Sequence, residues 1–189
     1  MTLPADPAGR HRAVAAGFTA RVRGVSDWDA PAPVAGWRAR DVVGHLAGWF
    51  PDFLESATGL VLDRGPSAEE DPVAAWRVHA DAVQRVLDGP EAATPFRHPF
   101  VGELPLPDAV DRFYTADVFM HTWDLARASG QDERLDPERC AELLAGMEPI
   151  EELMRSSGQY GPRVPVPDDA DAQTRMLGFI GRRPLRDPA

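Results

Sequence analysis

Apolar residues recur at intervals of three and four along four long segments of this 189-residue chain. This spacing places them on one face of a helix, so each segment predicts an amphipathic helix with one buried side. Such helices bury their apolar sides against one another, and the pattern therefore predicts an all-α four-helix bundle. The predicted helices run from about Asp6 to Val25, Arg38 to Phe53, Asp71 to Gly89, and Pro107 to Gly130.

Proline-rich segments separate the predicted helices, because proline cannot continue a helix interior. Residues 90–105 hold several prolines, and we expect a long loop or a short strand pair there. A fifth helix is predicted from about Pro137 to Ser156, followed by an extended segment and a short additional C-terminal helix. No change in composition marks a second domain. We therefore expect residues 1–189 to form one domain, with the tail of about 157–189 packing on the bundle.

The composition restricts the classes of partner. The formal net charge is −10, which argues against nucleic acid, since nucleic acid is bound mainly through Lys and Arg. No segment has the apolar length of a membrane span or of a signal peptide, so we expect a cytoplasmic protein. All basic residues are Arg, which is typical of a GC-rich, actinobacterial genome. A homodimer is expected as the commonest oligomer, and the single cysteine, Cys140, is expected to be buried.

Three ionisable residues interrupt the apolar stripe of the fourth predicted helix. Asp117 and His121 are four residues apart, and Asp124 follows on the same face. An ionisable group buried without a partner costs several kcal/mol, so a core-facing stripe normally excludes such residues. Side chains at this spacing stand about 6 Å apart and can reach one ion. This stripe is therefore the first place to look for function.

A metal site is one interpretation of the stripe. His45 lies on the inward face of the second predicted helix, and metal sites of bundles are built from inward side chains of facing helices. Two imidazoles and a carboxylate would suit zinc with an open coordination position, or Fe²⁺ as a facial triad. The alternative is that His45 and His121 are hydrogen-bonded core residues, with Asp117 paired to an Arg. Spacing alone does not decide between these interpretations.

Three motifs resemble a known family. The stretch from Trp37 to Trp49 reads W-x-x-x-D-V-V-G-H-L-A-G-W, and the stretch from Asp117 to Gly130 reads D-V-F-M-H-T-W-D-L-A-R-A-S-G. Both resemble the ligand motifs of the mycothiol-dependent maleylpyruvate isomerase N-terminal domain family, in the DinB-like superfamily of metal-binding four-helix bundles. The tail from Tyr160 to Pro184 resembles the ending of an actinobacterial subgroup. The likeness covers most of the chain.

The resemblance implies a divalent metal, usually zinc, with Ni²⁺ or Fe²⁺ as alternatives. Carried onto this chain, the ligands are His45, Asp117 and His121, although the isomerase has Glu where this chain has Asp117. Asp124 is expected to orient an imidazole, as the carboxylate partner of a metal-bound His does, or to form a structural hydrogen bond. The implied reaction is the activation of a low-molecular-weight thiol, mycothiol, for transfer to a small-molecule substrate or for isomerisation.

Other residues have both a functional and a structural interpretation. Trp49 and Trp123 could line a substrate pocket, or they could simply pack in the core. His79 could be a fourth ligand or could shuttle protons in the pocket, but a partly exposed histidine is the simpler expectation. A fourth ligand would favour a closed, structural metal site in a non-catalytic binding or stress-response protein. Metal-dependent hydrolysis, with water in place of the thiol, is a further alternative.

Overall fold

The computed structural model describes residues 2–99, 101–156 and 158–184. The chain divides into two compact units. One spans Pro4–Glu133, and the other contains the described residues from Arg134 onward. Each unit is treated by itself below, and the expectation of a single domain with a packed tail stays a prediction.

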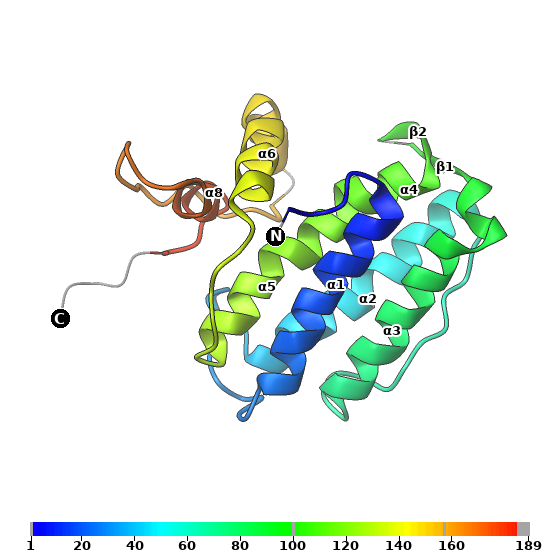
Figure 1. Ribbon diagram of the computed structural model, residues 1–189, viewed down its shortest axis with the longest axis horizontal. Coiled ribbons are helices and arrows are strands. Elements are labelled where there is room, and N and C mark those ends of the chain that lie inside the picture. Colours follow the sequence, from blue (N-terminus) through cyan, green and yellow to red (C-terminus); the bar gives the residue numbers. More distant parts are fainter. Residues whose placement is uncertain (1, 100, 157, 185–189) are drawn as a thin grey trace. The chain divides into compact units, whose positions relative to one another are not determined.

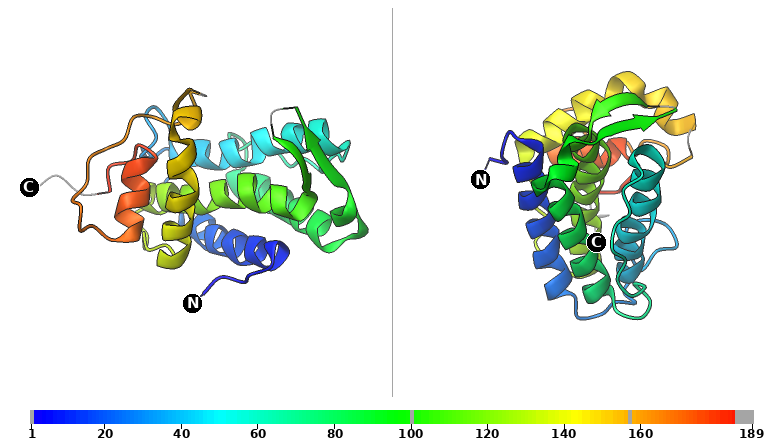
Figure 2. Two further views of the ribbon diagram at one scale, coloured as in Figure 1. Left: turned by 90° about the horizontal axis from the view of Figure 1, so that it is seen from above. Right: turned by 90° about the vertical axis from the view of Figure 1, so that its right-hand side faces the viewer.

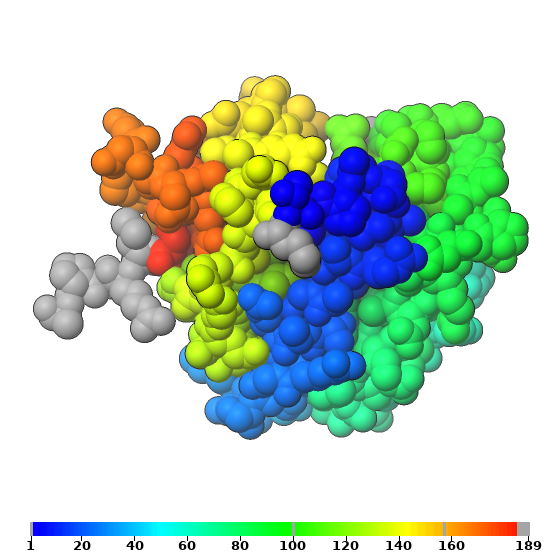
Figure 3. Space-filling model, in the orientation of Figure 1, coloured from blue at the N-terminus to red at the C-terminus, as the bar shows by residue number. Residues whose placement is uncertain are grey.

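The first unit is a four-helix bundle, as the sequence predicted (Figure 1). α1 packs against α3 and α5, and α2 packs against the same two helices from the other side of the bundle. Figure 2 shows the long helices of this unit side by side, and in Figure 3 the side chains of α1 (blue) close against those of α3 (green). The helices are α1 (Pro7–Gly24), α2 (Ala39–Thr58), α3 (Pro72–Asp88) and α5 (Ala116–Ala128).

The fourth predicted helix is continuous, but it is not uniformly α-helical. It begins as the short α4 (Leu106–Ala109), widens into a π-helical segment, η2 (Val110–Thr115), and continues as α5. π-helical turns inside α-helices are uncommon and occur frequently at functional sites. Here the wider turn ends two residues before Asp117, so it sets the rotation at which that carboxylate enters the bundle.

Aspartate caps begin four of the helices. In the first unit, Asp6 accepts a hydrogen bond from the backbone N–H of Gly9, and Asp71 accepts one from Ala74. Each cap satisfies a donor that the first turn would otherwise leave unpaired. A proline follows each of these two aspartates, and its fixed φ suits the first helical position. Asp136 and Asp171 cap α6 and α8 in the same way.

The Asp71 cap gives a direct test of this account. Asp71→Ala should lower the free energy of unfolding by about 1 kcal/mol, because α3 loses its only side-chain cap. Urea denaturation followed by circular dichroism measures the change. Asp71→Asn keeps an acceptor at the same position and should stay within a few tenths of a kcal/mol of the parent. Equal losses in both variants would mean that the charge, and not the hydrogen bond, supports the helix.

A small hairpin follows α3. After the 3₁₀ turn η1 (Pro90–Ala93), strands β1 (Pro95–His98) and β2 (Gly102–Pro105) pair in antiparallel fashion, with Phe96 opposite Leu104. Phe96 is buried and anchors the hairpin on the bundle. Of the two alternatives for this proline-rich segment, the strand pair is the one that the structure contains.

The second unit is built from α6 (Pro137–Met147), η3 (Glu148–Ile150), α7 (Glu151–Ser156) and α8 (Ala172–Phe179), with α6 packed against α8. Its extended segment is held to α8 by a hydrogen bond from the Val164 N–H to the Gly178 carbonyl. A Cβ atom at position 178 would lie 2.8 Å from the Val164 carbonyl oxygen, so this approach requires glycine. Within the described residues, no helix has both the length and the apolar character needed to cross a bilayer.

Cys140 of α6 is fully buried, as expected. Burial, together with the nearby charges of Asp136 and Asp171, raises the pKa of its thiol to about 12. Thiolates, and not thiols, act as nucleophiles. The buried thiol of Cys140 therefore stays protonated near neutral pH and packs as a small apolar group of the second unit.

Candidate metal centre

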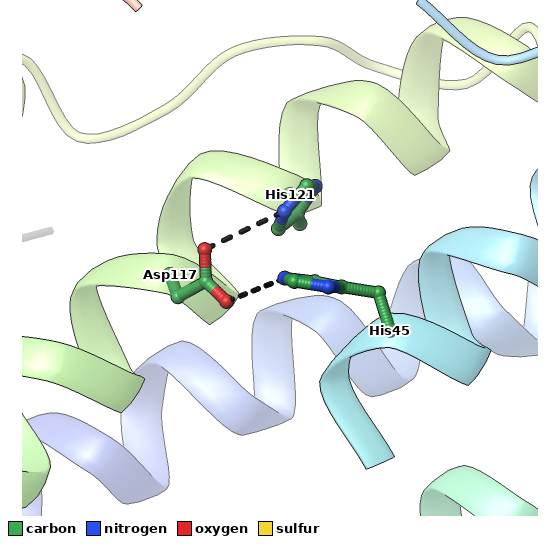
Figure 4. Close-up of side chains that lie close together, drawn as sticks. All are labelled: His45, Asp117 and His121. Atoms are coloured by element: carbon green, nitrogen blue, oxygen red, sulfur yellow. Dashed lines mark hydrogen bonds and ion pairs between the residues drawn. The ribbon is translucent and has the colours of Figure 1, made fainter. Parts of the chain in front are cut away.

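Two facing helices bring His45, Asp117 and His121 together (Figure 4). His45 comes from the first half of α2, and Asp117 and His121 come from successive turns of α5. One ligand atom from each of the three side chains lies within 4.8 Å of the other two. The close approach of α2 and α5 thus joins residues that are 72 positions apart in the sequence.

Asp117 lies between the two imidazoles. Its Oδ2 is 3.0 Å from Nε2 of His45, and its Oδ1 is 3.4 Å from Nε2 of His121. The exposed fraction of the side chain falls from 31% at His45 to 17% at Asp117 and 7% at His121. The cluster is therefore buried at the His121 end and open toward solvent at the His45 end.

Asp124 holds the inner imidazole in place. Its carboxylate is fully buried, and its Oδ2 is 2.8 Å from Nδ1 of His121. Nδ1 donates to this carboxylate, so Nε2 is the nitrogen that faces Asp117 and that a metal would use. The two roles considered for Asp124 were to orient an imidazole and to form a structural hydrogen bond. This one hydrogen bond to His121 serves both roles.

Two tryptophans frame the cluster. Trp49, one turn beyond His45, donates its indole N–H to Oδ2 of Asp117 at 3.0 Å. The ring of Trp37 stacks on His121 with an interplanar angle of 17° and also contacts the ring of His45. Sequence reasoning did not assign Trp37 to the site, although this residue begins the first of the motifs quoted above. This position at the start of the motif was the sequence signal that could have placed Trp37 at the site.

The electrostatic environment favours an ionised carboxylate at Asp117. Burial acts to raise the pKa of this group, but the charge of His121 and the hydrogen bonds from His45 and Trp49 outweigh burial. The pKa of Asp117 is therefore lowered from its usual range. A buried anion beside two imidazoles is a favourable environment for a divalent cation.

The donor set fits a metal on chemical grounds. Imidazole nitrogen and carboxylate oxygen are ligands that zinc accepts, and the same three donors occur in non-haem Fe²⁺ sites. The carboxylate of Asp124 on the far nitrogen of His121 is the partner that metal-bound histidines almost always have. Among the described residues this is the cluster that meets the criterion of three converging ligand side chains. The residues present therefore suit a divalent ion.

Comparison with known proteins agrees with this geometry. The family model described as the mycothiol maleylpyruvate isomerase N-terminal domain matches residues 11–126, more than half of the chain. The chain belongs to this family. The matched segment contains all three clustered side chains and ends two residues beyond Asp124. No solved structure matches the chain.

Two mycobacterial relatives align with most of this member of the mycothiol maleylpyruvate isomerase N-terminal domain family. Two proteins from two strains of Mycobacterium tuberculosis, both described as uncharacterized, are 27% identical to it over 182 residues. The alignment covers 94% of this chain and 98% of each relative. The likeness therefore extends beyond the family domain and into the second unit, and it agrees with an actinobacterial origin.

Two residues considered for the substrate pocket of this family member pack against residues outside the three-membered cluster. Trp123 is buried, and the guanidinium of Arg127 lies 4.5 Å from the centre of its ring. His79 is also buried, with its ring against Phe50 and Tyr114. The expectation that His79 would be partly exposed is wrong. Neither residue belongs to the three-membered ligand cluster, whereas Trp49 contacts it directly.

His79 belongs instead to a second polar group inside the bundle, which sequence reasoning missed. His11 of α1 and Tyr114 of η2 are buried beside it, with the two histidine rings 5.7 and 5.3 Å from the ring of Tyr114. Nδ1 of His11 is 2.9 Å from the hydroxyl of Thr115. Three buried polar atoms of this group, His11 Nε2, His79 Nε2 and Tyr114 Oη, have no hydrogen-bond partner among the described residues. The available signal was spacing, because His11 lies three residues before Val14 and His79 lies three residues after Trp76, on or beside the apolar stripes.

The contact between Asp124 and His121 predicts a measurable effect on metal binding. Asp124→Asn should weaken zinc affinity by about 10–100-fold, because the imidazole loses its anionic partner. Competition with a chromophoric chelator measures the affinity, and circular dichroism checks that the buried substitution leaves the fold intact. Asp108→Asn, at an exposed carboxylate of α4, is the matched control. An unchanged affinity in Asp124→Asn would remove Asp124 from the site.

Proposed function

We propose that this protein is a metal-dependent enzyme that activates a low-molecular-weight thiol, such as mycothiol, for transfer or isomerisation. The observation that carries the proposal is the cluster of two imidazoles and one carboxylate, open to solvent at His45. Three protein ligands leave room for an exchangeable one, which is the arrangement of catalytic zinc sites. Membership of the mycothiol maleylpyruvate isomerase N-terminal domain family supports the choice of thiol.

The roles of the side chains follow from their contacts. His45, Asp117 and His121 would hold a divalent ion such as zinc, with Fe²⁺ or Ni²⁺ as alternatives. When bound, the ion supplies Lewis-acid chemistry, which lowers the pKa of a thiol or of water toward neutrality. Asp124 fixes the orientation of His121, and Trp49 fixes that of Asp117. Cys140 is buried in the other unit, so the thiol comes from a cosubstrate and not from this chain.

A purely structural metal is the competing possibility, and it would need a closed ligand set. Neither candidate for a fourth ligand supports closure. His79 contacts Phe50 and Tyr114 in the core, and Asp124 binds the far nitrogen of His121. The three-membered cluster thus favours catalysis over a non-catalytic binding role. A cytoplasmic location, a small-molecule substrate and a homodimer remain predictions that accompany the proposal.

The proposal is tested with protein purified without a histidine tag. We expect close to one equivalent of a divalent metal to copurify, and millimolar mycothiol to raise the melting temperature of the metal-loaded protein, because a ligand of the folded state stabilises it. S-methylated mycothiol, which lacks a free thiol, is the matched control and should give a smaller shift. A metal-loaded protein that does not respond to mycothiol would contradict thiol activation and favour the structural role.

A further inference from the structure

We propose that the second substrate of this enzyme is an aromatic acid, which lies along a strip of aromatic side chains beside the metal centre. The inference rests on the proposed function, because the strip begins at the metal-binding cluster. We define the aromatic strip as four residues that are all partly exposed, and we keep this name below. They are Trp49 and Phe53 of α2, Phe113 of η2, and His98 of β1.

The strip continues the line of metal ligands on both helices. On α2, His45, Trp49 and Phe53 follow one another at intervals of four, which places them on one helix face. On the facing helix, Phe113 stands one turn before Asp117. The hydrogen bond from Trp49 to Asp117 joins the strip to the cluster. The same two helices thus carry ligands at one end and aromatic rings at the other.

Ring contacts make the strip continuous. The ring of Phe53 lies 5.5 Å from Trp49, 5.8 Å from Phe113 and 5.0 Å from His98, measured between ring centres. These rings remain partly exposed after packing on one another. Buried aromatic pairs contribute about 0.5–1.5 kcal/mol beyond the apolar area they cover. A flat ring laid on the strip would complete this packing, and the first unit presents the surface directly beside the cluster.

A guanidinium extends beyond the aromatic strip. Arg112 is exposed, and its Cζ atom lies 5.4 Å from the centre of the Phe113 ring. Among the described residues Arg112 forms no ion pair, whereas Arg97 of the hairpin pairs with Glu103. A carboxylate is the natural partner of such a guanidinium, since the two groups share matching hydrogen-bond geometry. The far end of the aromatic strip therefore suits an anion.

The dimensions favour a small molecule with three parts. Eight residues separate His45 from Phe53, which is roughly 12 Å along the axis of α2. This length accommodates one aromatic ring with a metal-directed oxygen group at one end and a carboxylate at the other. The ring would contact Trp49 and Phe53, and the carboxylate would reach Arg112.

Hydroxamates probe each part separately, because the hydroxamate group binds divalent metals. Isothermal titration calorimetry compares the affinity of the zinc-loaded full chain for three probes: acetohydroxamate, benzohydroxamate and 4-carboxybenzohydroxamate. We expect benzohydroxamate to bind about tenfold more tightly than acetohydroxamate, from contacts with two rings. The added carboxylate should give a further gain of about 1.5-fold to fivefold at low salt, as expected for an exposed ion pair.

Variants assign these gains to residues. Phe53→Ala should abolish the gain from the phenyl ring and leave acetohydroxamate affinity unchanged, and Phe53→Leu should retain part of that gain. Arg112→Gln should abolish only the gain from the carboxylate, and its exposed position carries little risk to folding. Arg77→Gln, at an exposed arginine of α3 that forms no ion pair among the described residues, is the matched control and should change none of the affinities.

The outcomes separate the two proposals. If acetohydroxamate binds but the phenyl ring and the carboxylate add nothing, the inference about the aromatic strip is overturned and the metal centre stands. Gains that persist in Phe53→Ala and Arg112→Gln would overturn it equally, because the probes would then lie elsewhere. If no hydroxamate binds the zinc-loaded protein, the metal has no open coordination position. That result would contradict both the proposed function and the inference about the aromatic strip.

Discussion

Asp117→Asn will lower the affinity of the protein for zinc by at least about a hundredfold. Asparagine has nearly the same shape as aspartate, but it lacks the charge that lies between His45 and His121. Binding free energies of about 10–16 kcal/mol for four-ligand zinc sites assign about 3 kcal/mol to each ligand, and this energy corresponds to the stated loss. Chelator competition measures the affinity, with metal content after dialysis as an independent readout.

Two further variants make this result specific. Asp117→Glu keeps the charge and lengthens the side chain by one methylene group, so it should retain far more affinity than Asp117→Asn. His98→Ala removes a histidine that stands outside the ligand cluster and should leave zinc affinity unchanged. If Asp117→Asn binds zinc as tightly as the parent, the ion is held elsewhere, and both proposals above lose their basis.

The helices and the convergence of the three candidate ligands were predictable for a common reason. Periodic apolar positions reveal which face of each helix is buried, and His45, Asp117 and His121 stand on or beside those faces. Residues on the inward faces of a bundle come into contact if they lie at the same level along the bundle axis. The stripes therefore indicated that these three residues could converge. The stripes did not decide between a metal site and hydrogen-bonded histidines, and the family motif supplied that preference.

The surroundings of the cluster were less predictable, because they depend on how the helices are rotated against one another. The π-helical segment changes that rotation just before Asp117, and no sequence signal announced it. The contacts of Trp37 with His121 and of Trp49 with Asp117 depend on side-chain rotamers. His79 was misjudged because α3 packs on both α1 and α2, so its buried face is wider than its main apolar stripe.

The buried histidines make the bundle sensitive to acid. Lowering the pH from 7.5 to 5 should reduce the free energy of unfolding of the metal-free protein by about 4 kcal/mol, about 2 from each of His11 and His79. Burial lowers the pKa of each imidazole to about 4, with smaller contributions from Arg12 at His11 and from His11 at His79. Both histidines are therefore neutral in the folded protein at pH 5, whereas unfolded histidines are largely protonated there.

The sign of the effect follows from this difference. Between pH 6.5 and 4 the unfolded chain binds more protons than the folded chain, so acid favours unfolding. The stability contributed by each neutral histidine is complete above pH 6.5 and is lost progressively as the pH falls toward 4. Urea denaturation at a series of pH values measures the slope, and a chelator removes the pH-dependent contribution of metal binding.

Substitution of the two histidines shows how much each contributes to the change of the free energy of unfolding with pH. His79→Leu should remove about half of the pH dependence, because the leucine fills the site beside Tyr114 without a group that titrates. His11→Leu should remove the other half, with an additional constant loss, since the hydroxyl of Thr115 loses its partner at Nδ1. The double variant should unfold with nearly the same free energy at pH 7.5 and pH 5. A slope that survives in the double variant would assign the acid sensitivity to other groups, and the unpaired Nε2 atoms of the two histidines would then have no role in it.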